Sequence, residues 1–267
     1  MPDLTADVTS VRAHYDTVLA DHYSRMFGDF EAKVSEQRAL LERLGVTVGA
    51  GAATAVDLGC GSGFQSVALA RLGFRVLAID FSRPLLAELT DRVRGLPVEA
   101  IAGDIREVAR LVSTAVDLAV CMGDTLLHLE CETDLARVFD GVASRLVVGG
   151  RLVLTFRDLS RELRELDRVI PVHASDELVM TCFLEYEPTT VRVHDLIWAR
   201  QRDGWHFRKG AYRKLRLAPQ TVTTALERAG FEVERHQAPG GMVALVGIAA
   251  SPRRPWPEND PRQSGTA

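Results

Sequence analysis

The sequence predicts an α/β protein with a doubly wound, mostly parallel sheet of seven strands and an added antiparallel β layer. Between residues 53 and 157, short apolar runs alternate with amphipathic stretches, as in strands linked by helical crossovers. The apolar runs are nearly continuous, which is typical of strands buried on both faces of a parallel sheet. After residue 157 the pattern changes to runs rich in β-forming residues separated by turn signals, which predicts antiparallel hairpins.

Five strands and three helices are expected in the first half of the chain. The strands are Ala53–Cys60, Arg75–Ser82, Pro97–Asp104, Val116–Gly123 and Gly150–Arg157. The helices are Phe64–Leu72, Arg83–Arg94 and Asp134–Val147. Pro84 follows Ser82 by two residues, which is typical of a helix start with proline in its first turn.

The second half is expected to add hairpins, a helix and a closing hairpin. The strand-like runs are Glu177–Tyr186, Val191–Arg200, Trp205–Leu217, Phe231–Gln237 and Met242–Ala250. A helix over Pro219–Ala229 ends at Gly230, a residue favoured just after helices. The closing hairpin predicts that the final strand runs antiparallel to the rest of the sheet.

These elements predict that the chain is divided into four segments. Residues 1–50 read as a helical lid, and residues 51–157 with 218–250 as the core that binds a cofactor. Residues 158–217 read as an antiparallel β insertion on the substrate side. Residues 251–267 hold four prolines and little apolar content, so a disordered tail is expected there.

The composition favours an ordinary globular protein. The 267 residues are 46% hydrophobic and 25% charged, with a formal net charge of −4. An acidic balance does not favour nucleic acid, and no run approaches the roughly 18 apolar residues of a membrane span. The N-terminus is polar, so no cleaved leader is expected. The scarcity of lysine among the basic residues is typical of a GC-rich bacterial genome.

The four cysteines are Cys60, Cys121, Cys131 and Cys182, and no two have the spacing of a zinc or disulfide motif. We therefore expect reduced thiols in a cytoplasmic protein and no metal site. A homo-oligomer is left open.

The sharpest signal is the run Val56-Asp57-Leu58-Gly59-Cys60-Gly61-Ser62-Gly63 between the first strand and the first helix. Glycines there let the backbone turn tightly and approach a ligand. In doubly wound sheets the ligand crevice lies at the carboxyl ends of the strands, so the loop lies at the expected place.

Acidic residues end the neighbouring strands. Asp80 lies 19 residues past Gly61, where an acid can bind both hydroxyls of a ribose. Asp104 ends the third strand, within reach of an adenine amino group. Asp57 precedes the loop and suits a ligand that carries an ammonium group. Ordinary structural roles remain open, because Asp80 and Asp104 could each cap the helix that follows.

A nicotinamide dinucleotide fits this crevice less well. Its fingerprint is G-x-G-x-x-G, whereas this loop is G-x-G-x-G with Phe64 at the next position. The carboxylates would also repel a pyrophosphate. A cationic adenosyl ligand without phosphates fits better.

These motifs resemble the class I S-adenosylmethionine-dependent methyltransferases, whose fold is Rossmann-like. The resemblance covers residues 53–157 by motif and 231–250 by architecture. It implies S-adenosyl-L-methionine as cofactor, S-adenosyl-L-homocysteine as product and a transferase of methyl groups (EC 2.1.1.-). The residues that it implies in cofactor binding are Asp57, Gly59, Cys60, Gly61, Gly63, Asp80, Phe81, Ser82, Gly103, Asp104, Ile105, Cys121, Met122 and Gly123. Tyr15 and Tyr23 resemble the tyrosines of an N-terminal helix that covers the cofactor in such enzymes.

The end of the fourth strand, from Cys121 to Leu129, lacks the Asn/Asp-Pro-Pro-Tyr segment of enzymes that methylate adenine or glutamine. It is similar instead to the GN-S-x-x-H-L stretch of glycine and sarcosine N-methyltransferases. Gly123 and His128 match, whereas Asp124 replaces the asparagine. The resemblance implies a small-molecule acceptor, amino-acid-like or a secondary metabolite, that is methylated on N or O.

Four residues are candidates for acceptor binding: Asp124, Arg157, Tyr212 and Arg213. Arg157 resembles the arginine that holds a substrate carboxylate in the glycine-methylating group, a task suited to its planar fork. It could instead pair with Asp158 or Glu162 on the surface, and Tyr212 could be an ordinary sheet residue.

Methyl transfer by in-line displacement needs positioning first, and a base only when the nucleophile arrives protonated. Asp124, His128 and His14 are the candidate bases, with a histidine better matched near neutral pH. A purely structural role for His128 stays open. Three alternatives also stay open: cyclisation or another use of the adenosyl cofactor, a nicotinamide-dependent oxidoreductase, and a cofactor-binding partner without catalytic activity.

Overall fold

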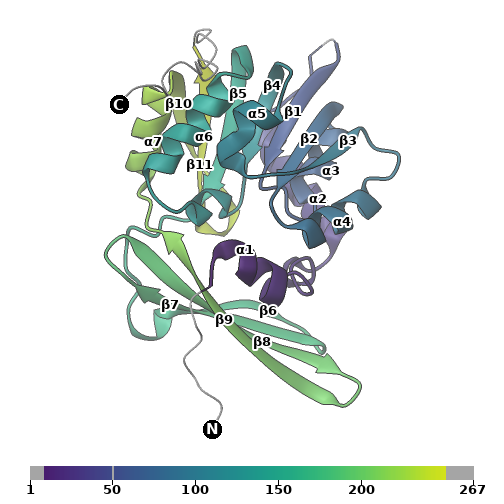
Figure 1. Cartoon of the computed structure of the whole chain (residues 1–267), viewed down its shortest axis with the longest axis vertical. Helices are drawn as coiled ribbons and strands as arrows, with labels where there is room; N and C mark the ends of the chain where they lie inside the picture. The colour runs from purple at the N-terminus through teal and green to yellow at the C-terminus, as the bar shows by residue number, and fades with distance from the viewer. Residues whose placement is uncertain (1–8, 50, 251–267) are drawn as a thin grey trace, which may run out of the picture.

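The central sheet has seven strands, as predicted. A computed structural model describes residues 9–49 and 51–250 (Figure 1). The strand order is β10-β11-β5-β4-β1-β2-β3. The strands are β1 (Ala53–Leu58), β2 (Phe74–Asp80), β3 (Val98–Ala102), β4 (Val116–Cys121), β5 (Leu146–Phe156), β10 (Phe231–Gln237) and β11 (Val243–Ala249). β11 pairs antiparallel with β5 while β1 to β5 are parallel, so the predicted reversal of the last strand is confirmed.

Helices cover both faces of this sheet. On one face lie α2 (Phe30–Arg43), α3 (Phe64–Arg71) and α4 (Arg83–Arg92), and on the other α5 (Val108–Leu111), α6 (Thr133–Ala143) and α7 (Pro219–Arg228). Successive residues of β1 point to opposite faces, so Ala55 and Val56 enter two different apolar cores. β3 is an edge strand with Glu99 and Ala102 exposed, so the expectation of burial on both faces does not hold for it.

A second, antiparallel sheet lies below the carboxyl ends of the parallel strands in Figure 1. Its strands are β6 (Val169–Ala174), β7 (Leu178–Tyr186), β8 (Thr190–Gln201) and β9 (Gly204–Leu215), paired in that order. Along β8 buried and partly exposed residues alternate, so this sheet has an inner and an outer face. The sequence predicts β7 to β9, but β6 was missed.

The N-terminal segment passes between the two sheets. It comprises α1 (Val11–His14), a short π-helix η1 (Tyr15–Leu19) and a 3-10 helix η2 (Arg25–Phe27), followed by α2 (Figure 1). Its links are to both layers: the Thr9 amide donates to the Ala211 carbonyl at 3.0 Å, and the Ser82 hydroxyl donates to Asp16 at 3.1 Å. Only residues 9–28 occupy this position, because α2 packs against α3.

The predicted division into domains stays a prediction, and the expected tail at 251–267 lies outside the described residues. Among the residues that the structure describes, no helix has the length and apolar character needed to cross a membrane.

Candidate functional site

The glycine loop joins β1 to α3 through backbone conformations that favour glycine. Gly59, Gly61 and Gly63 have φ angles of 73°, 53° and 101°. A Cβ placed on Gly61 would lie 3.1 Å from the Tyr23 ring, so the ring lies directly over this bare stretch of backbone. The loop and the tyrosine of the N-terminal segment therefore form two sides of one narrow space.

Asp80, at the end of β2, holds the loop in place. Its Oδ2 accepts the Gly61 amide and its Oδ1 accepts the Ser82 amide, both at 2.8 Å. Burial raises the pKa of this carboxyl, against the lowering effect of these hydrogen bonds. A carboxylate has about four lone-pair sites, so both oxygens can still accept hydroxyl groups from a ligand. Asp80 thus combines the capping contact and the position expected of a ribose-binding acid.

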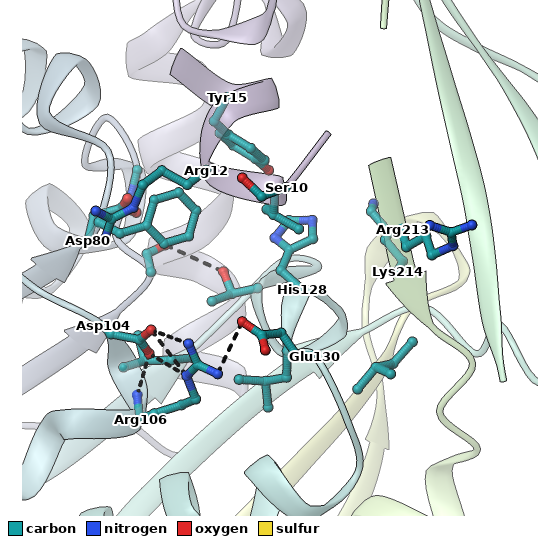
Figure 2. A pocket seen from close by; sticks show the side chains of 18 of the residues that line it. Ser10, Arg12, Tyr15, Asp80, Asp104, Arg106, His128, Glu130, Arg213 and Lys214 are labelled. Carbon is teal, nitrogen blue, oxygen red and sulfur yellow. Dashed lines mark hydrogen bonds and ion pairs between the residues drawn. The ribbon is translucent and has the colours of Figure 1, made fainter. Parts of the chain in front are cut away.

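Asp104, after β3, forms a fork with Arg106. It accepts the Arg106 amide at 2.9 Å and the guanidinium at 2.7 and 3.1 Å, and it begins the short helix η3 (Ile105–Glu107) (Figure 2). Burial alone would raise the pKa of Asp104, but the hydrogen bonds from Arg106 outweigh it and lower that pKa. The alternative role as a cap is therefore observed, and the residue still lines the cavity described next.

A first cavity of about 670 Å³ lies over these strand ends, within the ~300–1,000 Å³ range of small-molecule sites. Its lining includes Ser10, Arg12, Tyr15, Tyr23, Gly59, Gly61, Asp80, Phe81, Asp104, Ile105, Arg106, Thr125, His128, Glu130, Arg213 and Lys214. Figure 2 shows Asp80 and Asp104 on one side of this space and Lys214 on the other. Ten of these lining residues belong to the predicted site.

Seven predicted residues line neither cavity among the described residues: His14, Asp57, Cys60, Gly63, Ser82, Gly103 and Cys121. They lie behind the residues that line the two cavities. Asp57 is buried beneath the loop, where the Ser66 hydroxyl donates to it at 2.6 Å. Burial raises the pKa of Asp57 to about 7. The Gly103 amide donates to the Asp80 carbonyl, and Gly63 begins α3 against Leu89. Their direct contact with a cofactor stays a prediction.

A second cavity of about 550 Å³ adjoins the first, and the two share Tyr15, Tyr23, Gly59, Thr125, His128 and Lys214. Its walls come from both sheets and from the N-terminal segment. Met122 and Gly123 line it, as do the candidate acceptor residues Asp124, Arg157 and Tyr212. Arg213 lies at the first cavity instead, with its guanidinium 2.7 Å from Glu187.

Asp124 is held between two cations. It pairs with Lys214 of β9 at 2.7 Å and with Arg157, which follows β5. Burial alone would raise its pKa, but the charges of Lys214 and Arg157 outweigh it and hold the pKa of Asp124 well below its usual range. Asp124 is therefore an anion that joins the two sheets. Arg157 pairs here, rather than with Asp158 or Glu162.

The two candidate histidines occupy different places. His128 lies in the wall between the cavities, with its ring centroid 5.4 Å from that of Tyr15 and 5.7 Å from that of Tyr212. Burial and the nearby Lys214 lower its pKa to about 3, so the ring is neutral, and its buried Nε2 has no partner among the described residues. His14 is fully buried and bonds to Asp195 at 2.7 Å.

Three residues that line the cavities were not predicted from the sequence: Arg106, Asp195 and Lys214. One signal was available for Asp195. Along β8 it alternates in register with Val191, Val193 and Ile197, so it is an acid at a core-facing position. No comparable signal marks the other two, because their roles depend on partners distant in sequence.

Comparison with known proteins agrees with this geometry. Residues 55–150 match a family model described as a methyltransferase domain. Together with the reversed seventh strand, this match defines the fold of the chain as that of the class I S-adenosylmethionine-dependent methyltransferases, and the predicted fold class is confirmed.

Solved structures with this fold include an S-adenosylmethionine-dependent methyltransferase from Clostridium acetobutylicum. It has a TM-score of 0.70 and 16% identity, over 87% of this chain and 97% of that one. The CcbJ methyltransferase from Streptomyces caelestis has a TM-score of 0.72 and 21% identity, over 89% of this chain and 98% of that one.

Curated relatives match over shorter stretches. A cypemycin N-terminal methyltransferase of a Streptomyces species is 34% identical over 105 residues, which is 39% of this chain and 42% of the relative. A glycine/sarcosine N-methyltransferase of Halorhodospira halochloris is 30% identical over 165 residues, which is 58% of this chain and 60% of the relative. The chain thus spans about two fifths to three fifths of the length of such relatives. The predicted resemblance to the glycine and sarcosine group is confirmed.

Proposed function

We propose that the protein is an S-adenosylmethionine-dependent methyltransferase that transfers a methyl group to N or O of a small molecule by in-line displacement. The observation that carries this proposal is the Asp80 carboxylate, fixed by two backbone amides beside a bare glycine loop, in a cavity that shares six lining residues with a second one. The N- and O-methyltransferases among the relatives support it.

The residues of the first cavity fit an adenosyl ligand. Both oxygens of Asp80 can accept ribose hydroxyls, and the uncovered Gly61 backbone permits close approach. Two acids, Asp80 and Asp104, stand at the strand ends beside the loop, where a pyrophosphate would be repelled. This arrangement favours the adenosyl ligand over a nicotinamide dinucleotide.

When bound, S-adenosylmethionine supplies a methyl group that its sulfonium already activates. The chain has to hold the acceptor, exclude water and align one lone pair. Tyr15 and Tyr23 line both cavities and would cover the junction between them. His128 would accept a hydrogen bond from the N–H or O–H of the acceptor through its unpartnered Nε2. Arg157 has donors left for an acidic group of the acceptor.

We also propose that the protein works in the cytoplasm, since its four cysteines are free. The absence of a nucleic-acid partner and the state of assembly stay predictions.

Calorimetric titration tests the cofactor. Wild-type protein is titrated with S-adenosylmethionine, S-adenosylhomocysteine and NADH, beside Asp80→Ala and a control, Asp91→Ala, which removes an exposed acid of α4. We expect micromolar binding of the adenosyl ligands, lost in Asp80→Ala and kept in the control. Preference for NADH, or no adenosyl binding, would overturn the proposal. A screen of amines and phenols for the mass of one added methyl group then tests the reaction.

A further inference from the structure

The segment between β5 and β6 has a sequence that favours a helix, although most of it is irregular in the structure. Eight of the eleven residues 158–168 are leucine, arginine or glutamate, which are among the best helix formers. Within this described segment the one regular element is the 3-10 turn η5 (Glu165–Arg168). Disagreement between local preference and the observed conformation is typical of functional or strained sites.

The backbone of this segment is strained at Glu165. Its φ angle is 49°, and among the described residues it is the one non-glycine residue with a positive φ. Strain of this kind persists only where the surrounding structure or the function retains it. Glu165 would lose the strain in an α-helix, where φ is about −63°.

A helix over residues 159–168 would place the leucines on one side. Leu159, Leu163 and Leu166 follow one another at intervals of four and three residues, which is the spacing of one helical face. The arginines and glutamates would point away from this face. Leu163 and Leu166 are 39% and 84% exposed in the structure, so the apolar face of this helix still lacks a partner to pack against.

The contacts at the start of the segment are those of a helix start. Asp158 accepts the Ser160 amide at 3.0 Å, as a side chain that caps a helix does. Arg216, which follows β9, donates to the Ser160 carbonyl at 2.9 Å and to Glu162 at 2.8 Å. A carbonyl oxygen has two lone pairs, so the Ser160 carbonyl can keep this contact and also accept a helical hydrogen bond.

Both ends of the segment lie at the second cavity. Leu159 lines this cavity before the segment, and Ile170 and Val172 of β6 line it after the segment. Ile170 also lies four residues after Leu166, so it continues the spacing of the leucines. The apolar face of the helix would therefore face the second cavity. Residues of β7 and β8 continue the same apolar wall: Met180, Leu184 and Val193.

Such a helix needs a partner to be stable. Ten residues are fewer than the roughly 12–15 that an isolated helix requires, so its stability would come mainly from packing of the leucines. The apolar part of a ligand in the second cavity, whose volume is about 550 Å³, would provide the surface for this packing. Formation of the helix is therefore coupled to binding of that ligand.

We propose that residues 159–168 fold into an amphipathic helix over a methyl acceptor with an apolar body, and that Leu163 and Leu166 contact this body. This deepens the proposed function and rests on it, because the candidate acceptor residues Asp124, Arg157 and Tyr212 line the second cavity. The helix would exclude water from the acceptor. The two leucines would favour acceptors that carry hydrocarbon at this end over small polar ones.

Two substitutions of Glu165 test the proposal in opposite directions. Alanine favours a helix and disfavours a positive φ, whereas glycine does the reverse. In saturating S-adenosylhomocysteine, each protein is titrated with N-phenyl-1-naphthylamine, a neutral apolar probe that fluoresces when bound. We expect Glu165→Ala to bind the probe roughly fivefold or more tightly than Glu165→Gly, with wild type between them. The same two substitutions at Glu227, an exposed residue of α7 that lines neither cavity, should leave the affinity unchanged.

Hydrogen exchange reports formation of the helix itself. In wild-type protein the bound probe should slow amide exchange over residues 161–168 at least tenfold, and S-adenosylhomocysteine alone should not. Leu166→Ser should weaken probe binding about tenfold, because it removes an apolar contact. The matched control is Val148→Ser, which changes a side chain that is 61% exposed and lines neither cavity, and it should have no effect.

The contrary results are distinct. Equal affinities of the two Glu165 variants, no binding of the probe by wild type, or binding without slower exchange over residues 161–168 would each overturn the proposal while S-adenosylhomocysteine still binds. An unchanged affinity in Leu166→Ser would overturn the contact between the leucine and the ligand. Failure of S-adenosylhomocysteine to bind is a separate result, which would overturn the proposed function and this inference with it.

Discussion

Asp57 is a carboxylate enclosed beneath the glycine loop, and it should make stability depend on pH. Burial raises its pKa to about 7, against about 3.9 in an unfolded chain. The folded state therefore binds the proton more tightly, so the free energy of unfolding falls as the pH rises from about 4 to about 7. Asp57→Asn removes the titrating carboxyl group, so the stability of this variant should lack that pH dependence.

The variant should consequently gain stability over wild type as the pH rises. Between pH 5 and pH 8 we expect a relative gain of about 2–3 kcal/mol. Denaturant unfolding at both pH values, without ligand, measures this difference, and the exposed Asp91→Asn serves as control. A difference between Asp57→Asn and wild type that stays constant with pH would contradict the prediction.

His128 differs from a titrating catalytic histidine. Its pKa of about 3 keeps the ring neutral from pH 5 to pH 9, so it contributes no inflection near pH 6.5 to the profile of kcat. His128→Leu should lower kcat by about ten- to a hundredfold through lost alignment of the acceptor, with the shape of the profile unchanged. Rate measurements across this range, with an acceptor from the screen, test it. An inflection in wild type that disappears in the variant would identify His128 as a titrating base.

The positions of the residues at the strand ends could be predicted, because they depend on contacts between residues close in sequence. Asp80 and the glycines of the loop depend on the turn between one strand and the next helix, and the sequence places both correctly. Asp195 and Lys214 could not be assigned, because their partners lie 181 and 90 residues away. The sequence predicts His14 as a candidate base. It could not predict the hydrogen bond between His14 and Asp195, because the two residues are far apart in the chain.

Among the elements, the parallel strands were predictable from their continuous apolar runs, whereas β6 was not. β6 is short and has no fully buried residue. It also contains Pro171 and has an irregular register against β7, so it lacks the usual alternation of buried and exposed residues. The segment 158–168 before it has no regular element apart from a single 3-10 turn, η5 (Glu165–Arg168). The placement of the second sheet over the strand ends also depends on side-chain pairs that no local pattern encodes.

The link between β9 and the turn after β4 should stabilise the fold. Among the described residues, Lys214→Met leaves the buried Asp124 with Arg157 as its one remaining ion-pair partner. We expect a loss of about 2–4 kcal/mol at neutral pH, since one partner of a buried ion pair is removed. The low pKa of Asp124 means that this contribution is present above pH 4 and is lost as the pH falls towards that pKa.

Denaturant unfolding of Lys214→Met at pH 7 and below pH 4 measures both effects. Arg38→Met breaks an exposed pair with Glu42 on α2 and should cost less than about 1 kcal/mol. Equal losses in the two variants at pH 7 would contradict a role for Lys214 in joining the sheets.

At the scale of the whole molecule, the ligand should couple the N-terminal segment to both sheets. Tyr15 and Tyr23 line both cavities, so a ligand that fills either one packs against this segment. S-adenosylhomocysteine should slow amide hydrogen exchange at least tenfold over residues 11–27. The far end of the β8–β9 hairpin, residues 198–207, lines neither cavity and should not change. Exchange measured by mass spectrometry, with and without the ligand, tests this, and protection confined to the parallel sheet would contradict it.

The position of the N-terminal segment between the sheets also bears on how the protein is made. His14 bonds to Asp195, and Thr9 to Ala211, across 181 and 202 residues of chain. At ~5–20 residues per second, the ribosome adds Asp195 roughly 10–40 s after His14. Thr9 and His14 therefore cannot form these hydrogen bonds until the second sheet has been synthesised. The parallel sheet can begin to form during this interval, but the cavity for the acceptor closes only late in synthesis, so an unfinished chain carries the cofactor loop without a place for the acceptor.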